Sequence, residues 1–230
     1  MSDDDENDFE IKIDFKSGEG DPARIFKTMS GLIDAFQSLD SHLTSSFDVS
    51  LQASLVLDNV EAGSIKAKFH DVISGIPDEA LKGAEWKKII GHFLLKSKYA
   101  ILKWTGERNS ITNREDVKSL ENTLKKIAEE TDLKLLPAYS APSADVLLSD
   151  IYSIQESLEN LDEEDIATYT YDNNETNFNR DLDISNEVVR EVLTKEVVES
   201  SGKRILKVKK PDLLGQSIWA FQYDGRSIEA

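Results

Sequence analysis

Two carboxylates close to the end of the chain are of the types that metal-dependent chemistry requires. Asp212 follows a proline, and Glu229 follows the run SIWAFQYDGRSI. A metal-dependent nuclease can hold a divalent cation between an Asp and a Glu on neighbouring strands, while a Lys close after the Glu positions the attacking water. No Lys follows Glu229, because the next residue, Ala230, is the last. The pattern therefore favours a loop and a hairpin whose aromatic side chains fill a core or an interface: Trp219, Phe221 and Tyr223.

A group of lysines between residues 82 and 103 is a candidate for binding. Only Glu85 opposes them, and three aromatic residues are interspersed. Lysines among aromatic side chains can bind a nucleic-acid backbone while bases stack. The aromatic residues occupy apolar positions of a helix, which favours a core role for them and a solvated or docking surface for the lysines. An acidic segment such as Asp3 to Glu10 would suit that surface. The candidate binding residues are Lys87, Lys88, Lys96, Lys98 and Lys103.

No other residues have the spacing of a catalytic, metal or cofactor site. The histidines, His42, His70 and His92, fall in three separate elements and form no local metal-binding pair. The carboxylates between residues 156 and 165 form a run without the alternation of a calcium loop. The glycines before Asp21 precede a helix, but no Lys-Ser/Thr pair follows them. The chain has no cysteine, and we predict no metal, no cofactor and no enzymatic activity.

The composition is that of an acidic globular protein. Apolar residues make up 39% and charged residues 31% of the 230 residues, and the formal net charge is −17. Such a charge repels nucleic acid and anionic membranes. The first eight residues are too polar and too negative to pack, which predicts a disordered leader and argues against a secretion signal. No run approaches the roughly 20 apolar residues of a membrane span, so we expect a cytoplasmic protein with no membrane partner.

The patterns in the first third of the chain predict an α+β fold. Residues 9–15 alternate apolar and polar side chains, as in a half-buried strand. Asp21-Pro22 starts a helix whose apolar residues recur at steps of three and four. Two further alternating runs, at 51–57 and 65–69, predict a hairpin with a short polar turn. The expected N-terminal unit is therefore strand, helix, strand, strand.

Helices dominate the middle of the chain. Apolar spacing predicts a helix at 85–104 and a second helix that begins with a capping box from Thr112 to Glu115. Leu147 to Leu161 then form a stripe that is typical of a packed helix. The acidic, Asn-rich residues 162–183 predict an exposed loop, or a mobile segment with one short strand from Ala167 to Tyr171.

The end of the chain predicts a helix at 186–198 and then short strands, with a tight turn at Asp224-Gly225. Pro137 and Pro142 bracket a linker that divides the chain. Because a domain rarely ends within an alternating strand, we expect the native chain to continue beyond Ala230. The predicted organisation is a leader (1–8), an α+β domain with a helical extension (9–136), and a helix with a small β-rich lobe (143–230).

Three stretches stand out as a set: GDPARIFKTMSGLIDAF (Gly20–Phe36), LVLDNVEAGSIKAKF (Leu55–Phe69) and SIWAFQYDGRSIEA (Ser217–Ala230). They cover under a quarter of the chain. They resemble segments of a family of small bacterial proteins to which no function is attached. The resemblance implies a bacterial origin in a multi-gene cassette, such as an antiviral defence locus, and it carries over no functional residue.

These observations favour a non-enzymatic interaction or assembly component of a bacterial multi-protein system. Helices with apolar stripes can pack on partner helices, and an open strand edge can accept another strand. We therefore expect a protein partner or self-association. The first alternative is a metal-dependent nuclease or phosphodiesterase that uses Asp212 and Glu229. The second is an acidic DNA mimic, which needs carboxylates spaced along one face like phosphates.

Overall fold

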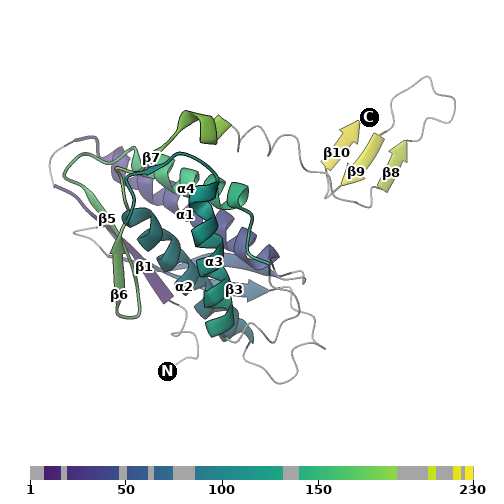
Figure 1. The fold of residues 1–230 in the computed structure, drawn as a ribbon, viewed down its shortest axis with the longest axis horizontal. Coiled ribbons are helices and arrows are strands. Elements are labelled where there is room, and N and C mark those ends of the chain that lie inside the picture. Colours follow the sequence, from purple (N-terminus) through teal and green to yellow (C-terminus); the bar gives the residue numbers. More distant parts are fainter. Residues whose placement is uncertain are drawn as a thin grey trace. The chain divides into compact units, whose positions relative to one another are not determined.

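The computed structural model describes residues 8–16, 20–46, 51–61, 65–74, 86–131, 140–190, 207–210, 220–223 and 226–229 (Figure 1). The chain divides into two compact units, Met1–Leu193 and Thr194–Ala230. The elements of the first unit are β1 (Asp8–Asp14), α1 (Ala23–Ser45), β2 (Gln52–Glu61), β3 (Ile65–Ser74), α2 (Trp86–Gly106), β4 (Ser110–Ile111), α3 (Glu115–Glu130), α4 (Ala144–Leu158), β5 (Ile166–Tyr171), β6 (Asn174–Asn177) and β7 (Asp183–Ile184).

A five-stranded antiparallel sheet forms the framework of the first unit. Its strand order is β2-β3-β1-β5-β6, so β1 lies at the centre. β1 pairs with β3 on one side and with β5 on the other. The side chains of β1 alternate between buried and half-buried positions, because successive side chains point to opposite faces of a sheet. Phe9, Ile11 and Ile13 therefore enter the core, as the alternation in the sequence predicts.

Helices cover the apolar face of this sheet. α1 and α2 contact the strands, α4 packs along α1, and α3 contacts both α2 and α4 (Figure 1). Gly31 permits the close approach of α1 and α4, since a Cβ atom at this position would lie 2.5 Å from Oγ of Ser157. The ion pair of Arg24 with Asp165 ties the start of α1 to the residue before β5. One apolar core extends from the sheet through the four helices.

This arrangement confirms the predicted α+β fold and the order strand, helix, strand, strand. The Ala23 amide donates to Oδ1 of Asp21 over 2.9 Å, as expected for an aspartate at a helix start. β2 and β3 form the predicted antiparallel hairpin, in which Leu57 lies opposite Phe69 and the next aligned residue, Asn59, lies opposite Lys68. The residue between them, Asp58, is the extra residue of a β-bulge.

The capping box of α3 lies one residue later than predicted. The Asp116 amide donates to Oδ1 of Asn113 (3.1 Å), and the Asn113 amide donates to Oδ2 of Asp116 (3.2 Å). The Thr112 amide donates to the same oxygen of Asp116 (2.9 Å). Glu115 instead forms an exposed ion pair with Lys118. Asn and Asp can replace Thr and Glu in such a reciprocal pair, because each side chain carries an oxygen that accepts a hydrogen bond from a backbone amide.

Residues 162–183 are not the predicted exposed loop. The short strand expected there is β5, which joins β6 in a hairpin that extends the sheet from β1. The turn of this hairpin contains Asp172, whose φ of 49° is one that Asp adopts more readily than most residues. Phe178 and Leu182, beyond β6, are buried in the core. The short strand is confirmed as β5, but the exposed loop is not, because isolated buried residues such as Phe178 and Leu182 stand among acidic and amide residues and form no continuous apolar pattern.

The predicted division at Pro137 also differs from the observed organisation. α4 and β5, which follow it, complete the core and the sheet that the N-terminal elements begin. The compact unit continues to Leu193. The stripe predicted from Leu147 to Leu161 is buried, and its residues up to Leu158 lie on α4.

The second unit contains a small antiparallel sheet with the order β10-β9-β8. Its strands are β8 (Lys207–Lys210), β9 (Ala220–Tyr223) and β10 (Arg226–Glu229). Tyr223 lies opposite Arg226 in the β9–β10 hairpin. The predicted turn residues between them lie outside the described residues, as do residues 191–198 of the predicted helix. The predicted leader does so too, except for Asp8, which begins β1.

Candidate functional site

The face of the sheet that points away from the core carries charged side chains from neighbouring strands. Lys66 pairs with Glu10 over 2.8 Å, and Lys68 pairs with Asp8 over 2.5 Å, in each case between β3 and β1. Partly exposed ion pairs of this kind contribute only about 0–1 kcal/mol each. They can therefore rearrange at low cost when a ligand approaches.

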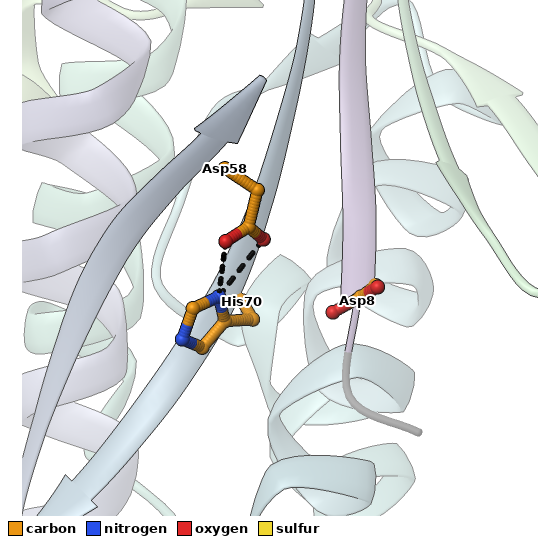
Figure 2. Close-up of side chains that lie close together, drawn as sticks. All are labelled: Asp8, Asp58 and His70. Atoms are coloured by element: carbon orange, nitrogen blue, oxygen red, sulfur yellow. Dashed lines mark hydrogen bonds and ion pairs between the residues drawn. The ribbon is translucent and has the colours of Figure 1, made fainter. Parts of the chain in front are cut away.

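Asp8, Asp58 and His70 come together on this face from three strands. Asp8 of β1 lies opposite His70 of β3 in the ladder. Nδ1 of His70 lies 2.9 Å from Oδ1 and 2.8 Å from Oδ2 of Asp58. Figure 2 shows the ring and this carboxylate facing each other, with Asp8 on the adjacent strand. One ligand atom of each residue lies within 4.8 Å of the others. Sequence reasoning missed this group because strand pairing alone brings the three residues together.

The two edge strands of the sheet differ in length and polarity. β6 has four residues, NETN, all of them polar. β2 has ten residues, and among the described strands it pairs with β3 alone. Three of its apolar side chains are strongly exposed: Val56 (40%), Leu57 (52%) and Val60 (54%). Short, polar edges resist the addition of another strand, whereas long, apolar edges invite it.

Four of the five candidate lysines lie at the surface of α2, and one does not. Lys87 and Lys103 are exposed, and Lys88 and Lys96 are half-buried. Lys98 is fully buried, with an exposed fraction of 0%, so its assignment to a binding surface is corrected. Trp86 and Trp104 belong to the core as predicted, since both are buried, whereas Tyr99 is partly buried and packs against the core.

Lys98 lies between two buried carboxylates, from α1 and β3. Its Nζ donates to both oxygens of Asp40 (2.7 and 2.8 Å) and to both oxygens of Asp71 (2.9 and 3.1 Å). The same Nζ lies 4.6 Å from the centre of the Phe9 ring. Both carboxylate side chains are at most 1% exposed. The cluster is therefore closed to a macromolecular ligand and joins α1, α2 and β3 inside the core.

The charges of this cluster depend on one another. Burial and the nearby charge of Asp71 raise the pKa of Asp40 well above its ordinary value. Burial acts to lower the pKa of Lys98, but the attraction of Asp40 and Asp71 outweighs it, and the pKa of Lys98 is raised. One lysine thus faces two buried carboxyl groups, and the raised pKa of Asp40 reflects the cost of holding two negative charges close together away from water.

The remaining histidines lie apart from the Asp8–Asp58–His70 group. His42 of α1 pairs with the buried Asp150 of α4, with Nδ1 2.9 Å from Oδ1. His92 lies on α2, so the three histidines occupy three elements, as predicted.

The C-terminal candidates are only partly described. Asp212 and Trp219 lie outside the described residues. Glu229 lies on β10, and Phe221 and Tyr223 lie on β9, where the backbone pairing alone is described. The nuclease hypothesis therefore stays a prediction.

Comparison with known proteins adds no family or function. No protein-family model, curated protein or solved structure matches the chain. Within the described residues, no helix has the length and apolarity to cross a membrane.

Proposed function

We propose that the chain is a non-enzymatic interaction or assembly component of a bacterial multi-protein system, and that it binds another protein through the edge of β2. The observation that carries this proposal is the contrast between the two edges of one sheet. β6 is short and polar, whereas β2 is long and exposes Val56, Leu57 and Val60. An extended segment that adds to such an edge gains backbone hydrogen bonds and buries these side chains.

The faces of β2 indicate the chemistry of the partner segment. Leu57 and Val60 lie opposite Phe69 and Ala67, whose side chains are buried on the helix-covered face. A partner strand would therefore place apolar side chains on that face. The acidic residues of β2 are Asp58 and Glu61, the strand has no basic residue, and the whole chain carries −17. Basic side chains on the other face of the partner would thus be attracted, whereas a second copy of β2 would be repelled.

Site-specific photo-crosslinking in the native cells tests this proposal. A benzophenone amino acid replaces Leu57 on β2 in one variant and Thr176 on β6 in the control variant. We expect a covalent adduct with another protein from position 57 and none from position 176. In a second experiment, the partner identified by crosslinking is captured with the wild-type chain and with a variant. The variant that carries both Leu57→Lys and Val60→Lys should no longer capture it. Thr176→Lys together with Asn177→Lys makes the same charge change on the other edge and should leave capture intact.

Three outcomes would contradict the proposal. One is the absence of an adduct from position 57, and another is equal labelling from both edges. The third is an adduct of twice the mass of the chain, because it would show that β2 binds a second copy of the chain and not another protein.

A further inference from the structure

Asp58, one of the acidic residues of β2, also forms with Asp8 and His70 a group whose metal-binding chemistry goes beyond protein binding at that strand. Two carboxylates and an imidazole are ligands that zinc-class divalent ions accept, whereas an imidazole is a poor ligand for magnesium or calcium. The three side chains rise from three adjacent strands of one sheet (Figure 2). The ladders fix the backbone positions of Asp8 and His70, and the paired residues Leu57 and Asn59 on either side of Asp58 hold its backbone in place.

The bulge in β2 places the third member of the group. Val56, and not Asp58, is the residue directly opposite His70. Asp58 is the extra residue outside the ladder, and its carboxylate turns back to the imidazole of His70. Bulges commonly re-aim a side chain in this way next to functional sites. Asp8 reaches the group from the other side, because β1 is the second neighbour of β3.

The distances suit a metal ion with small side-chain rotations. Zinc binds nitrogen and oxygen at about 2.1 Å, so two ligands of a tetrahedral ion lie roughly 3.4 Å apart. Nδ1 of His70 and the carboxylate oxygens of Asp58 are 2.8 and 2.9 Å apart, and an ion between them requires a small separation. The ligand atoms of all three residues lie within 4.8 Å of one another. Because this limit exceeds 3.4 Å, the carboxylate of Asp8 must move toward the other two to bind the same ion. Asp8 now pairs with Lys68, whose side chain is 45% exposed and can turn to solvent.

We propose that Asp8, Asp58 and His70 form a binding site for one zinc-class divalent ion on the outer face of the sheet. The ion takes Nδ1 of His70 and one oxygen from each aspartate. Its fourth position is open to water, as in zinc sites with three protein ligands. Bound metal would neutralise the two carboxylates and fasten β1, β2 and β3 together. The site does not depend on a protein partner at β2, so either proposal can fail alone.

Zinc titration of the full, untagged chain tests this site. The chain has three histidines, so their ring signals in proton NMR can be assigned by single variants. We expect the His70 signals to shift and saturate with one equivalent of Zn²⁺, while those of His42 and His92 stay in place. Magnesium chloride at the same concentration should leave all of them unchanged.

Calorimetric titration of variants identifies the ligands. His70→Ala, Asp58→Asn and Asp8→Asn should each weaken zinc binding by about tenfold or more, since even partners that only orient a ligand contribute about tenfold. His42→Ala removes the other imidazole–aspartate pair and is the matched control, with the wild-type affinity expected. Circular dichroism checks that each variant is folded, and the Asp8→Asn variant keeps the test valid if His70→Ala does not fold. Unmoved His70 signals in excess Zn²⁺, or equal losses in His42→Ala and His70→Ala, would overturn the proposal.

Discussion

Lys98, Asp40 and Asp71 form a polar centre that the fold can tolerate only as a set. Each group alone would be an uncompensated charge in the core, which is far more costly than a well-packed apolar residue. Together they satisfy one another, because the three N–H groups of Lys98 are shared among four carboxylate oxygens that lie 2.7 to 3.1 Å from Nζ. Because the partners come from α1, α2 and β3, the set also fixes how these three elements pack.

Removal of the cation alone should therefore be severe. We expect Lys98→Met to lower the free energy of unfolding by about 3–5 kcal/mol, because two carboxyl groups then remain buried without their partner. Urea denaturation at neutral pH measures this loss. Lys87→Met, at an exposed position of the same helix, is the matched control and should stay within about 0.5 kcal/mol of the wild type.

The triple variant with Asp40→Asn and Asp71→Asn added to Lys98→Met separates the charge from the packing. It should recover part of the loss, since no charge is left without a partner. A Lys98→Met protein as stable as the Lys87→Met control would show that the cluster contributes nothing to the fold.

The sequence contains a signal for this cluster: each of its charged residues stands at a position where the period predicts an apolar residue. This signal is missed when the lysines are grouped only by their closeness in sequence. Lys98 stands four residues after Leu94, a buried position of α2. Asp40 stands four residues after Phe36 in the stripe of α1, and Asp71 alternates with apolar residues of β3. Each is one charged residue at a position where the period predicts an apolar one. Periodicity can thus predict that all three are buried, but their mutual contact depends on tertiary packing, which a single sequence does not reveal.

At the scale of elements, the start of α3 has a capping box, as predicted, but the box lies one residue later than the prediction placed it. Thr112 to Glu115 and Asn113 to Asp116 both have the spacing of a capping box. The chain uses the second, in which the Asp116 carboxylate accepts from the amides of Thr112 and Asn113. A pattern with two acceptable registers predicts the element well and its first residue poorly.

We expect Asp116→Ala to destabilise the protein by about 1 kcal/mol at neutral pH, because helix-start amides lose their acceptor. Glu115→Ala, which removes the acid of the predicted box, should cost only a few tenths of a kcal/mol, as for exposed helix pairs. Urea denaturation of both variants decides between the two registers. An equal or larger loss in Glu115→Ala would contradict the observed box.

Acidification should reduce the effect of Asp116→Ala. The backbone amide of Thr112 is the main cause that lowers the pKa of Asp116. A carboxyl group with a lowered pKa stabilises the folded state above its unfolded pKa, and this contribution is lost as the pH falls through the folded value. The difference between the wild type and Asp116→Ala should therefore shrink as the pH falls below about 4.

For the whole molecule, the sequence predicts the class of fold better than its extent. The alternating and helical patterns of residues 9–69 predict the α+β class, because each element buries one face and shows the corresponding period. The prolines near residue 137 predicted a boundary that the first unit does not have, since β1 takes β5 as its second neighbour. Pairing between strands so distant in sequence leaves no local trace, and proline-bracketed linkers occur within domains as well as between them.

The pairing of β5 with β1 predicts how fragments of the chain behave. A fragment of residues 1–136 would leave the central strand β1 without one of its two neighbours and α1 without the apolar side chains of α4. We expect it to fail to unfold cooperatively in urea and to be degraded rapidly by trypsin. A fragment of residues 1–193 keeps the five-stranded sheet and the helices α1 to α4 of the first unit, so it should unfold in one cooperative transition. If the 1–136 fragment resists trypsin as well as the 1–193 fragment does, the core is complete without β5 and α4. Residues 1–136 would then form a domain of their own, as the predicted boundary near Pro137 requires.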